Sequence, residues 1–220
     1  MTDLKTLVTA VDSIIFDMDG TMVNTEPLHA KAAVMVLNEM GIDLDLESCL
    51  AKYYGMTDID VLKLTCPHLN DAQLEQTIEQ KNLHLVKIFQ LLKPEEKSSY
   101  VTPGLFEFFK YLKLHQKKIA VVSASEDIVV DSTLNCFAIE PFVDLKMGRG
   151  QTLLTKPHPQ PYLEGMKRLQ STPERTLIFE DSPTGLKSAV ASGALVVRIT
   201  GFAHSEEILH SLEIKNFLFR

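Results

Sequence analysis

The sequence predicts an α/β fold: a parallel sheet with helices on both faces, interrupted early by a helical insertion. Beyond residue 103, short runs of branched apolar residues alternate with longer stretches in which apolar residues recur at helical spacing. This alternation of strand and helix patterns favours a parallel sheet that is covered on both faces. Between residues 27 and 92 only the helical spacing is present, which predicts a separate block of helices.

The first predicted strand covers residues 13–16, an apolar run that ends at Asp17. Helical spacing follows at 28–40, 59–64 and 72–92. The charged, serine-containing stretch 94–103 then predicts a linker that returns to the sheet. We therefore expect a core domain and an inserted helical domain, with these boundaries: core 1–24 and 95–220, insertion 25–94.

The second half of the chain supplies the remaining elements of the core. Helices are expected at 105–115, 128–136, 157–169 and 183–192. Strands are expected at 118–122, 142–147, 176–179 and 194–199. Residues 216–219 fit either an edge strand or a docked tail. Ligands of open parallel sheets collect at the carboxyl ends of the strands, where polar residues stand here: Asp17, Ser123, Glu180 and Asp181.

Composition narrows the class of protein. The chain has 220 residues, 45% of them hydrophobic and 23% charged, the balance of a globular protein. A net charge of −7 without a basic block argues against nucleic acid as the main partner. The three cysteines lack metal-ligand spacing, which indicates free thiols in a reducing compartment. With no signal-peptide pattern and no apolar run of about 18 residues, we expect a cytoplasmic monomer that does not contact membranes.

Two carboxylates stand close together directly after the first strand. Asp17 and Asp19 flank one residue, and Gly20 allows the backbone to turn sharply. An EF-hand calcium loop does not fit, because the glycine comes two positions early and Leu28 stands where the bidentate Glu belongs. A plain acidic turn and a Mg²⁺ site with oxygen ligands both remain open.

The segment FDMDGT at residues 16–21 resembles the first signature of the haloacid dehalogenase superfamily. The resemblance implies that Asp17 is the nucleophile and forms an aspartyl-phosphate. It implies that Asp19 is the general acid and base, and that the Asp19 backbone carbonyl binds Mg²⁺. A carboxylate nucleophile divides a difficult hydrolysis into two easier steps, and a second carboxyl group can move the protons. An Asp at position 19 argues against the dehalogenase branch and against a phosphonate-cleaving branch that has Ala there.

Three further segments resemble the other signatures in the family's order: VVSAS at 121–125, TKPHP at 155–159 and IFEDSPTG at 178–185. The resemblance implies that Ser123 and the backbone at Ala124 hold phosphoryl oxygens, and that Lys156 balances the negative charge. It also implies that Asp181 binds Mg²⁺, while Glu180 binds it directly or through water.

Structural roles fit the same segments. Ser125 and Asp127 are candidate caps for the helix near residue 128, and Asp181 and Ser182 also fit the start of the helix at Pro183. Pro157 suits a helix start, and His158 is expected to be structural.

The insertion after the first signature resembles the helical-cap subclass, in the β-phosphoglucomutase-like and sugar-phosphatase group. This implies a Rossmann-like core with an inserted α-helical cap, acting on a small phosphorylated metabolite. Lys81-Asn82 is similar to the mutase pattern, but Asp58 stands where that pattern has a phosphate-binding Arg. We therefore expect a Mg²⁺-dependent phosphatase of a small phosphate monoester, a sugar phosphate. A phosphosugar mutase is the alternative.

An idle binding protein with this fold is a weaker third reading, since it would be expected to lose the catalytic residues, which are all present. Substrate specificity is expected to depend on residues 54–58 and on Lys81.

Overall fold

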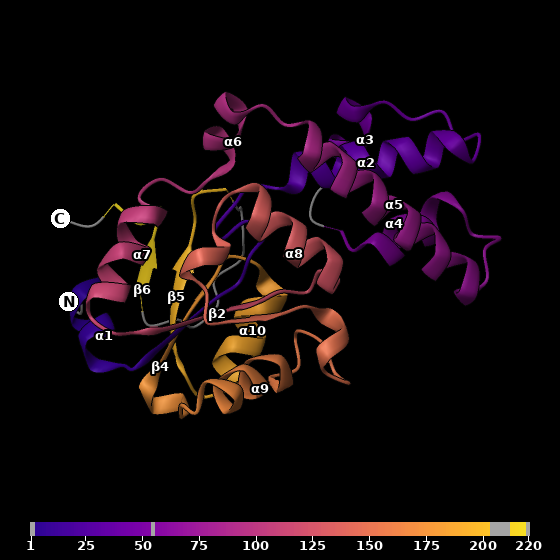
Figure 1. Cartoon of the computed structure of the whole chain (residues 1–220). Helices are drawn as coiled ribbons and strands as arrows, with labels where there is room; N and C mark the ends of the chain where they lie inside the picture. Colours follow the sequence, from indigo (N-terminus) through magenta and orange to yellow (C-terminus); the bar gives the residue numbers. More distant parts are fainter. Residues whose placement is uncertain (1–2, 54–55, 203–211, 219–220) are drawn as a thin grey trace. The chain divides into compact units, whose positions relative to one another are not determined.

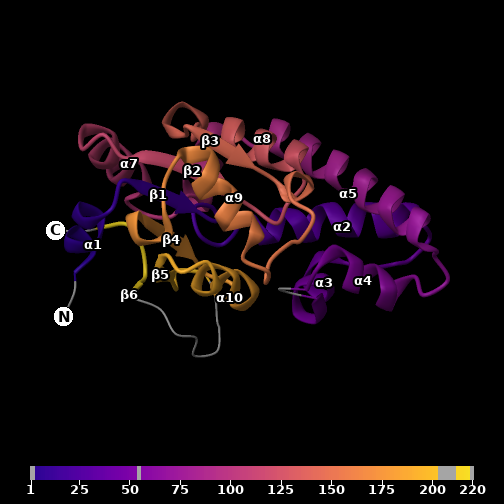
Figure 2. The ribbon, with the colours of Figure 1, turned by 90° about the horizontal axis from the view of Figure 1, so that it is seen from below.

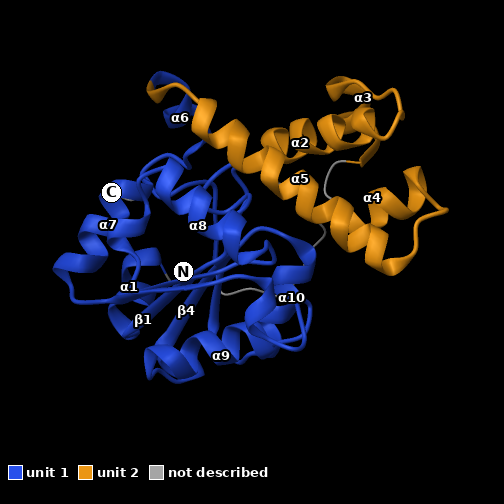
Figure 3. Cartoon of the chain, turned by 45° about the vertical axis from the view of Figure 1, so that its right-hand side comes forward, with its two compact units in different colours: residues 1–24, 95–220 blue, residues 25–94 orange. Residues whose placement is uncertain are grey.

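The computed structural model describes residues 3–53, 56–202 and 212–218. The chain divides into two compact units, coloured separately in Figure 3. Unit 1 consists of Met1–Asn24 and Glu95–Arg220, and unit 2 consists of Thr25–Pro94. No helix of the described part is long and apolar enough to cross a membrane.

Within the described residues of unit 1, six parallel strands form one sheet (Figure 1). The strands are β1 (Ser13–Phe16), β2 (Lys118–Val122), β3 (Leu145–Met147), β4 (Thr176–Glu180), β5 (Leu195–Ile199) and β6 (Leu212–Ile214). Their order in space is β3-β2-β1-β4-β5-β6. Strands β2 and β3 thus lie on one side of β1, and β4, β5 and β6 lie on its other side. The strand order reverses between β1 and β4, and the carboxyl ends of these two strands mark the switch point at which such sheets bind ligands.

Helices cover both faces of this sheet. Figure 2 looks onto the face that carries α9 (Gln160–Leu169) and α10 (Pro183–Ala191). Two further helices pack on strands of this sheet. Helix α7 (Leu105–Leu114) packs on β2, and helix α8 (Asp127–Cys136) packs on β3. Ile15 of β1 packs into the cluster beneath α9 and α10. Its neighbour Phe16 faces the opposite way, because side chains alternate along a strand.

An aromatic cluster fills the space around Phe16. The Phe16 ring stacks on Phe179 at 4.9 Å, and the Phe108 ring stacks on Phe217 at 5.2 Å. All four rings are buried. Burial of one such ring stabilises the fold by about 1.5 to 3 kcal/mol. This aromatic cluster and the apolar cluster beneath α9 and α10 therefore hold the sheet from both faces and support the residues that follow its strands.

Several elements differ from the sequence-based expectation. Residues expected as a linker contain the helix α6 (Pro94–Tyr100), which buries no side chain and so shows no apolar periodicity. Two short helices, α1 (Leu4–Ala10) and α3 (Leu46–Tyr53), were not predicted. The sheet edge near the C-terminus is β6, and Phe217 beyond it docks into the aromatic cluster.

Unit 2 is a bundle of helices. Besides α3 it contains α2 (Glu26–Glu39), α4 (Asp58–Thr65) and α5 (Asp71–Leu91). Asn70 and Gln73 form a reciprocal capping box at the start of α5, which satisfies backbone donors there. Lys81 of α5 is buried inside the bundle, where its Nζ donates to Asp58 Oδ2 at 2.7 Å and lies 3.0 Å from His29 Nδ1.

Candidate active site

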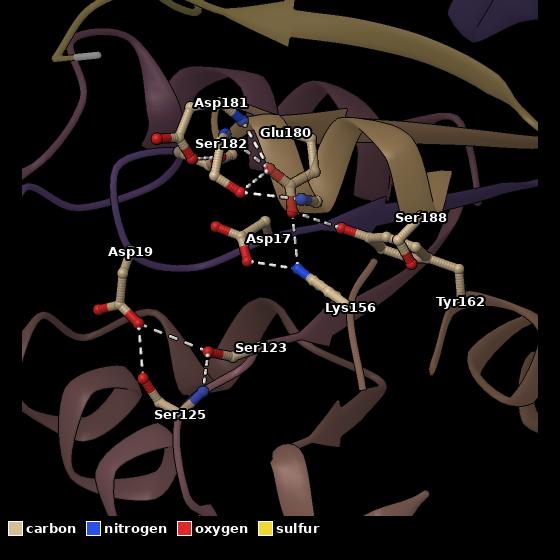
Figure 4. A network of polar contacts seen from close by, with 12 residues as sticks. Asp17, Asp19, Ser123, Ser125, Lys156, Tyr162, Glu180, Asp181, Ser182 and Ser188 are labelled. Carbon is tan, nitrogen blue, oxygen red and sulfur yellow. Dashed lines mark hydrogen bonds and ion pairs between the residues drawn. The ribbon is translucent and has the colours of Figure 1, made fainter. Parts of the chain in front are cut away.

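Asp17 and Glu180 are neighbours at the switch point of the sheet. The parallel register pairs Phe16 with Phe179, and the Asp17 N–H donates to the Phe179 carbonyl at 2.9 Å. Ser123 follows β2 on the other side of β1, and its N–H donates to the Met147 carbonyl. The polar residues that end the strands therefore meet at one edge of the sheet (Figure 4).

The loop after β1 approaches Asp181 closely at Gly20. Gly20 has φ +85, in the left-handed region, and a Cβ placed on it would lie 2.2 Å from Asp181 Oδ2. Beside it, the buried Thr21 hydroxyl donates to Asp181 Oδ1 at 2.8 Å. The Thr102 hydroxyl in turn donates to the Thr21 carbonyl. Only glycine permits this approach, because any side chain would displace the Asp181 carboxylate.

Lys156 bridges the two strand ends. Its Nζ lies 2.6 Å from Asp17 Oδ1 and 2.7 Å from Glu180 Oε1, with only 4% of its side chain exposed. Burial lowers the pKa of Lys156, but Asp17 and Glu180 outweigh burial and leave that pKa above its usual value. The ammonium is therefore charged, and it is held in a buried double ion pair.

Glu180 is fully buried and accepts hydrogen bonds at both carboxylate oxygens. Lys156 and the Tyr162 hydroxyl (2.9 Å) donate to Oε1. The N–H groups of Asp181 and Ser182, at 2.8 and 2.9 Å, and the Ser182 hydroxyl donate to Oε2. These donors occupy the lone pairs of the carboxylate. A Cβ on Gly185 would lie 1.6 Å from Oε1, so Gly185 leaves the space that Glu180 fills.

Three buried carboxylates come close enough together to bind one metal ion: Asp17, Glu180 and Asp181 each offer an oxygen within 4.8 Å of the others. Burial, opposed by Lys156 and assisted by Glu180, raises the pKa of Asp17 to about 7. Burial and the same Glu180 charge raise the pKa of Asp181. An all-oxygen donor set with more negative than positive charge fits a hard divalent cation such as Mg²⁺.

The Asp19 side chain lies apart from these carboxylates and contacts the loop after β2. Ser125 Oγ donates to Asp19 Oδ2 at 2.9 Å and Ser123 Oγ at 3.4 Å, while the Ser125 N–H donates to Ser123 Oγ (Figure 4). Ala124 between the two serines is exposed. The loop therefore presents two hydroxyl groups to Asp19.

The candidate cap residues of two helices, α8 and α10, have different outcomes. Ser125 and Asp127 do not cap α8. The N-cap residue of this helix is Glu126, whose side chain makes no capping hydrogen bond to the backbone. Asp127 instead accepts from the Gly148 N–H at 2.9 Å. Ser182 does cap α10, accepting from the Gly185 N–H.

The segment after Lys156 also differs in part. Pro157 does not begin a helix, since α9 starts at Gln160. The His158 carbonyl accepts from the Ser188 hydroxyl at 2.7 Å, a structural contact. Residues 54 and 55 of the expected specificity region lie outside the described residues.

Sequence reasoning missed Tyr162 and Thr21 as parts of this site. Tyr162 stands among apolar residues at a core-facing position of α9, so in the sequence it looks like a packing aromatic. Thr21 closes the FDMDGT segment, and its position beside the acidic loop was the one available signal.

Residues 14–199 match the family model described as haloacid dehalogenase-like hydrolase. A phosphorylated carbohydrates phosphatase of Thermotoga maritima is 28% identical, over 89% of this chain and 87% of that protein. Hexitol phosphatase B of Escherichia coli K12 is 24% identical, over 81% of this chain and 78% of that protein. A β-phosphoglucomutase structure from Clostridium difficile has a TM-score of 0.76 at 21% identity, over 94% of this chain and 92% of that one; it shares the fold.

Proposed function

The chain belongs to the haloacid dehalogenase-like hydrolase family, as its four signatures predicted, and we propose that it is a Mg²⁺-dependent phosphatase of a small phosphate monoester, a sugar phosphate. One observation carries the proposal. The Asp17 carboxylate, buried at the switch point of the sheet, is ion-paired through Oδ1 with a buried lysine and stands beside two further carboxylates. Such a cluster suits a nucleophile and cations that neutralise a phosphoryl group.

The residues fit a Mg²⁺ ion. Asp17 and Asp181 would hold it, with the backbone carbonyl of Asp19, and Glu180 would stay with its own donors. Within the described residues, the side-chain hydrogen bonds of Asp17 and Asp181 all end on Oδ1, so Oδ2 of each remains for the metal. When bound, the ion supplies positive charge that neutralises the phosphoryl oxygens.

In the first step, a carboxylate oxygen of Asp17 forms a bond to phosphorus while the bond from phosphorus to the leaving oxygen breaks. Asp19 donates a proton to that leaving oxygen, which departs as the alcohol. In the second step, Asp19 accepts a proton from water, and the water oxygen attacks phosphorus. The bond between Asp17 and phosphorus then breaks, which releases inorganic phosphate and restores both carboxyl groups.

Charge and hydrogen bonds account for most of the rate enhancement in phosphoryl transfer, because negative charge spreads over the transferred group. Lys156, already charged and held at Asp17, would offset that charge. The Ser123 hydroxyl and the amide at Ala124 would hold phosphoryl oxygens.

Two observations favour the phosphatase over the mutase. Two relatives of this chain are named phosphorylated carbohydrates phosphatase and hexitol phosphatase B. Within unit 2, Asp58 lies 2.7 Å from Lys81 Nζ and neutralises that ammonium. A mutase must bind a second phosphate, and the negative charge of Asp58, where the mutase pattern has an Arg, works against binding it.

The proposal is tested by phosphate release from a panel of sugar phosphates and one aryl phosphate, with Mg²⁺ or EDTA. Wild type is compared with Asp17→Asn and with Asp12→Asn as the matched control. Asp12 is exposed and directly precedes the first residue of β1. We expect release that needs Mg²⁺, survives Asp12→Asn and is lost in Asp17→Asn. Release that survives Asp17→Asn would contradict the assignment. A sugar 1-phosphate converted to its 6-phosphate with trace bisphosphate, without free phosphate, would establish the mutase instead.

A further inference from the structure

Tyr162 contacts two residues of the proposed catalytic centre, yet the mechanism above gives it no role. The side chain is fully buried. Its hydroxyl donates to Glu180 Oε1 at 2.9 Å, and its ring centroid lies 4.8 Å from Lys156 Nζ (Figure 4). One aromatic residue therefore contacts both the lysine and the carboxylate that holds the lysine.

Close packing of α9 on the sheet brings the Tyr162 hydroxyl to Glu180. Gly165 lies three residues after Tyr162 and so on the same face of the helix. A Cβ on Gly165 would lie 3.1 Å from Val122 Cγ2 and 3.4 Å from Ile15 Cδ1. The absence of a side chain at Gly165 lets α9 approach β1 and β2, and Tyr162 reaches the end of β4.

Packing alone explains the ring but not the hydroxyl. A phenylalanine would fill nearly the same space, and the hydroxyl needs an acceptor once it is buried. The acceptor here is the same oxygen, Glu180 Oε1, that receives Lys156. The N–H groups of Asp181 and Ser182 hold Glu180 Oε2, and the Tyr162 hydroxyl holds Oε1. The hydroxyl therefore restricts rotation of the carboxylate group.

We propose that Tyr162 is a positioning residue, which holds the Lys156 ammonium in place through Glu180 and through its own ring. Lysine has a long flexible stem, so an ammonium fixed in advance stabilises developing charge better than one that must be ordered during the reaction. The ring face adds attraction for the cation. This inference rests on the proposed phosphatase function, in which Lys156 neutralises the transferred phosphoryl group.

The test is Tyr162→Phe, which removes the hydroxyl and keeps the ring, with Tyr111→Phe on α7 as the matched control. Phosphate release gives kcat and KM, and calorimetry with orthovanadate and Mg²⁺ gives the dissociation constant of a mimic of the transferred group. We expect about a tenfold fall in kcat/KM, or about 1.4 kcal/mol, carried by kcat. The vanadate dissociation constant should rise by a similar factor, while Tyr111→Phe changes neither.

The vanadate measurement separates positioning from a structural role once thermal unfolding shows that Tyr162→Phe is almost wholly folded at the assay temperature, because the apparent dissociation constant then equals that of the folded enzyme. Unchanged vanadate binding in Tyr162→Phe, with or without a fall in kcat, would overturn the proposal. In a Glu180→Gln background the hydroxyl deletion should change vanadate binding by less than about twofold, since the shared partner is altered. Equal effects in both backgrounds would also overturn it.

Failure of the proposed function gives a different result. If wild type bound vanadate but released no phosphate from any ester, the phosphatase assignment would fail, and the comparison of vanadate binding would still decide the role of Tyr162. If wild type bound no vanadate, both proposals would be wrong.

Discussion

Replacing Gly20 with alanine tests whether the acidic loop after β1 needs its close contact with Asp181. Two costs arise in Gly20→Ala. The residue has φ +85, and a non-glycine residue in that region costs about 1 to 2 kcal/mol. The new Cβ would also lie 2.2 Å from Asp181 Oδ2, so the carboxylate must move. The first cost affects folding, and the second affects the proposed metal ligand.

Gly41 provides a control that separates these costs. It has φ +82, nearly the same backbone conformation, but among the described residues none except its own chain neighbours has an atom within 4 Å of a Cβ placed there. Gly41→Ala should therefore lower the free energy of unfolding by about 1 to 2 kcal/mol without disturbing the site. For a protein of this size, that corresponds to a fall of very roughly 2 to 8 °C in Tm.

The assay is phosphate release as a function of Mg²⁺ concentration, alongside thermal unfolding, for both variants. Both should unfold at lower temperature than wild type, but only Gly20→Ala should lose activity. We expect it to need about 10 to 100 times more Mg²⁺, the effect typical of disturbed surroundings of a metal ligand. Equal activity and equal Mg²⁺ dependence in the two variants would refute the role given to the Gly20–Asp181 contact.

Three further substitutions address other parts of the structure. Ser125→Ala removes the 2.9 Å donor to Asp19 and should slow phosphate release from alkyl phosphates about tenfold. Release from an aryl phosphate should slow less than about twofold, because its good leaving group needs little protonation. An equal loss on both substrates would contradict this role, and Ser125→Thr should restore the rate. Phe217→Ala should lower the free energy of unfolding in urea by about 3 to 5 kcal/mol, since Phe217 is 1% exposed and stacks on Phe108. The adjacent Leu218 is 67% exposed, so Leu218→Ala should change that free energy by no more than about 0.5 kcal/mol. Similar values for both variants would show that the C-terminal segment does not dock. Lys81→Ala should alter the ranking of sugar phosphates more than turnover of the aryl phosphate, and equal effects on all substrates would count against a role in specificity.

The central strands of the core could be predicted because they are buried on both faces. Residues 14–16 and 119–122 are continuous apolar runs, and β1 and β2 cover them together with Ser13 and Lys118. The helix α6 buries no side chain, so its sequence carries no periodic signal. For α9, the proline at 157 suggested a start three residues too early.

The site could be predicted in part, because each signature places a polar residue directly after a strand. Their partners could not be predicted. Ser125 fits a helix cap as well as a donor to Asp19, and only the three-dimensional path of the loop decides between them. The bond from Tyr162 to Glu180 joins residues on different elements, and it depends on how closely α9 packs on the sheet.

The central claim is that the carboxylate of Asp17 becomes covalently bonded to phosphorus. The most direct measurement is to mix wild type with its best substrate in Mg²⁺, quench with acid within one turnover and identify modified peptides by mass spectrometry. We expect one added phosphoryl group on the peptide that contains Asp17, lost when the quench is delayed until substrate is exhausted and missing in Asp17→Asn. Rapid phosphate release with an unmodified Asp17 peptide at every quench time, or a phosphoryl group on another residue, would contradict the account.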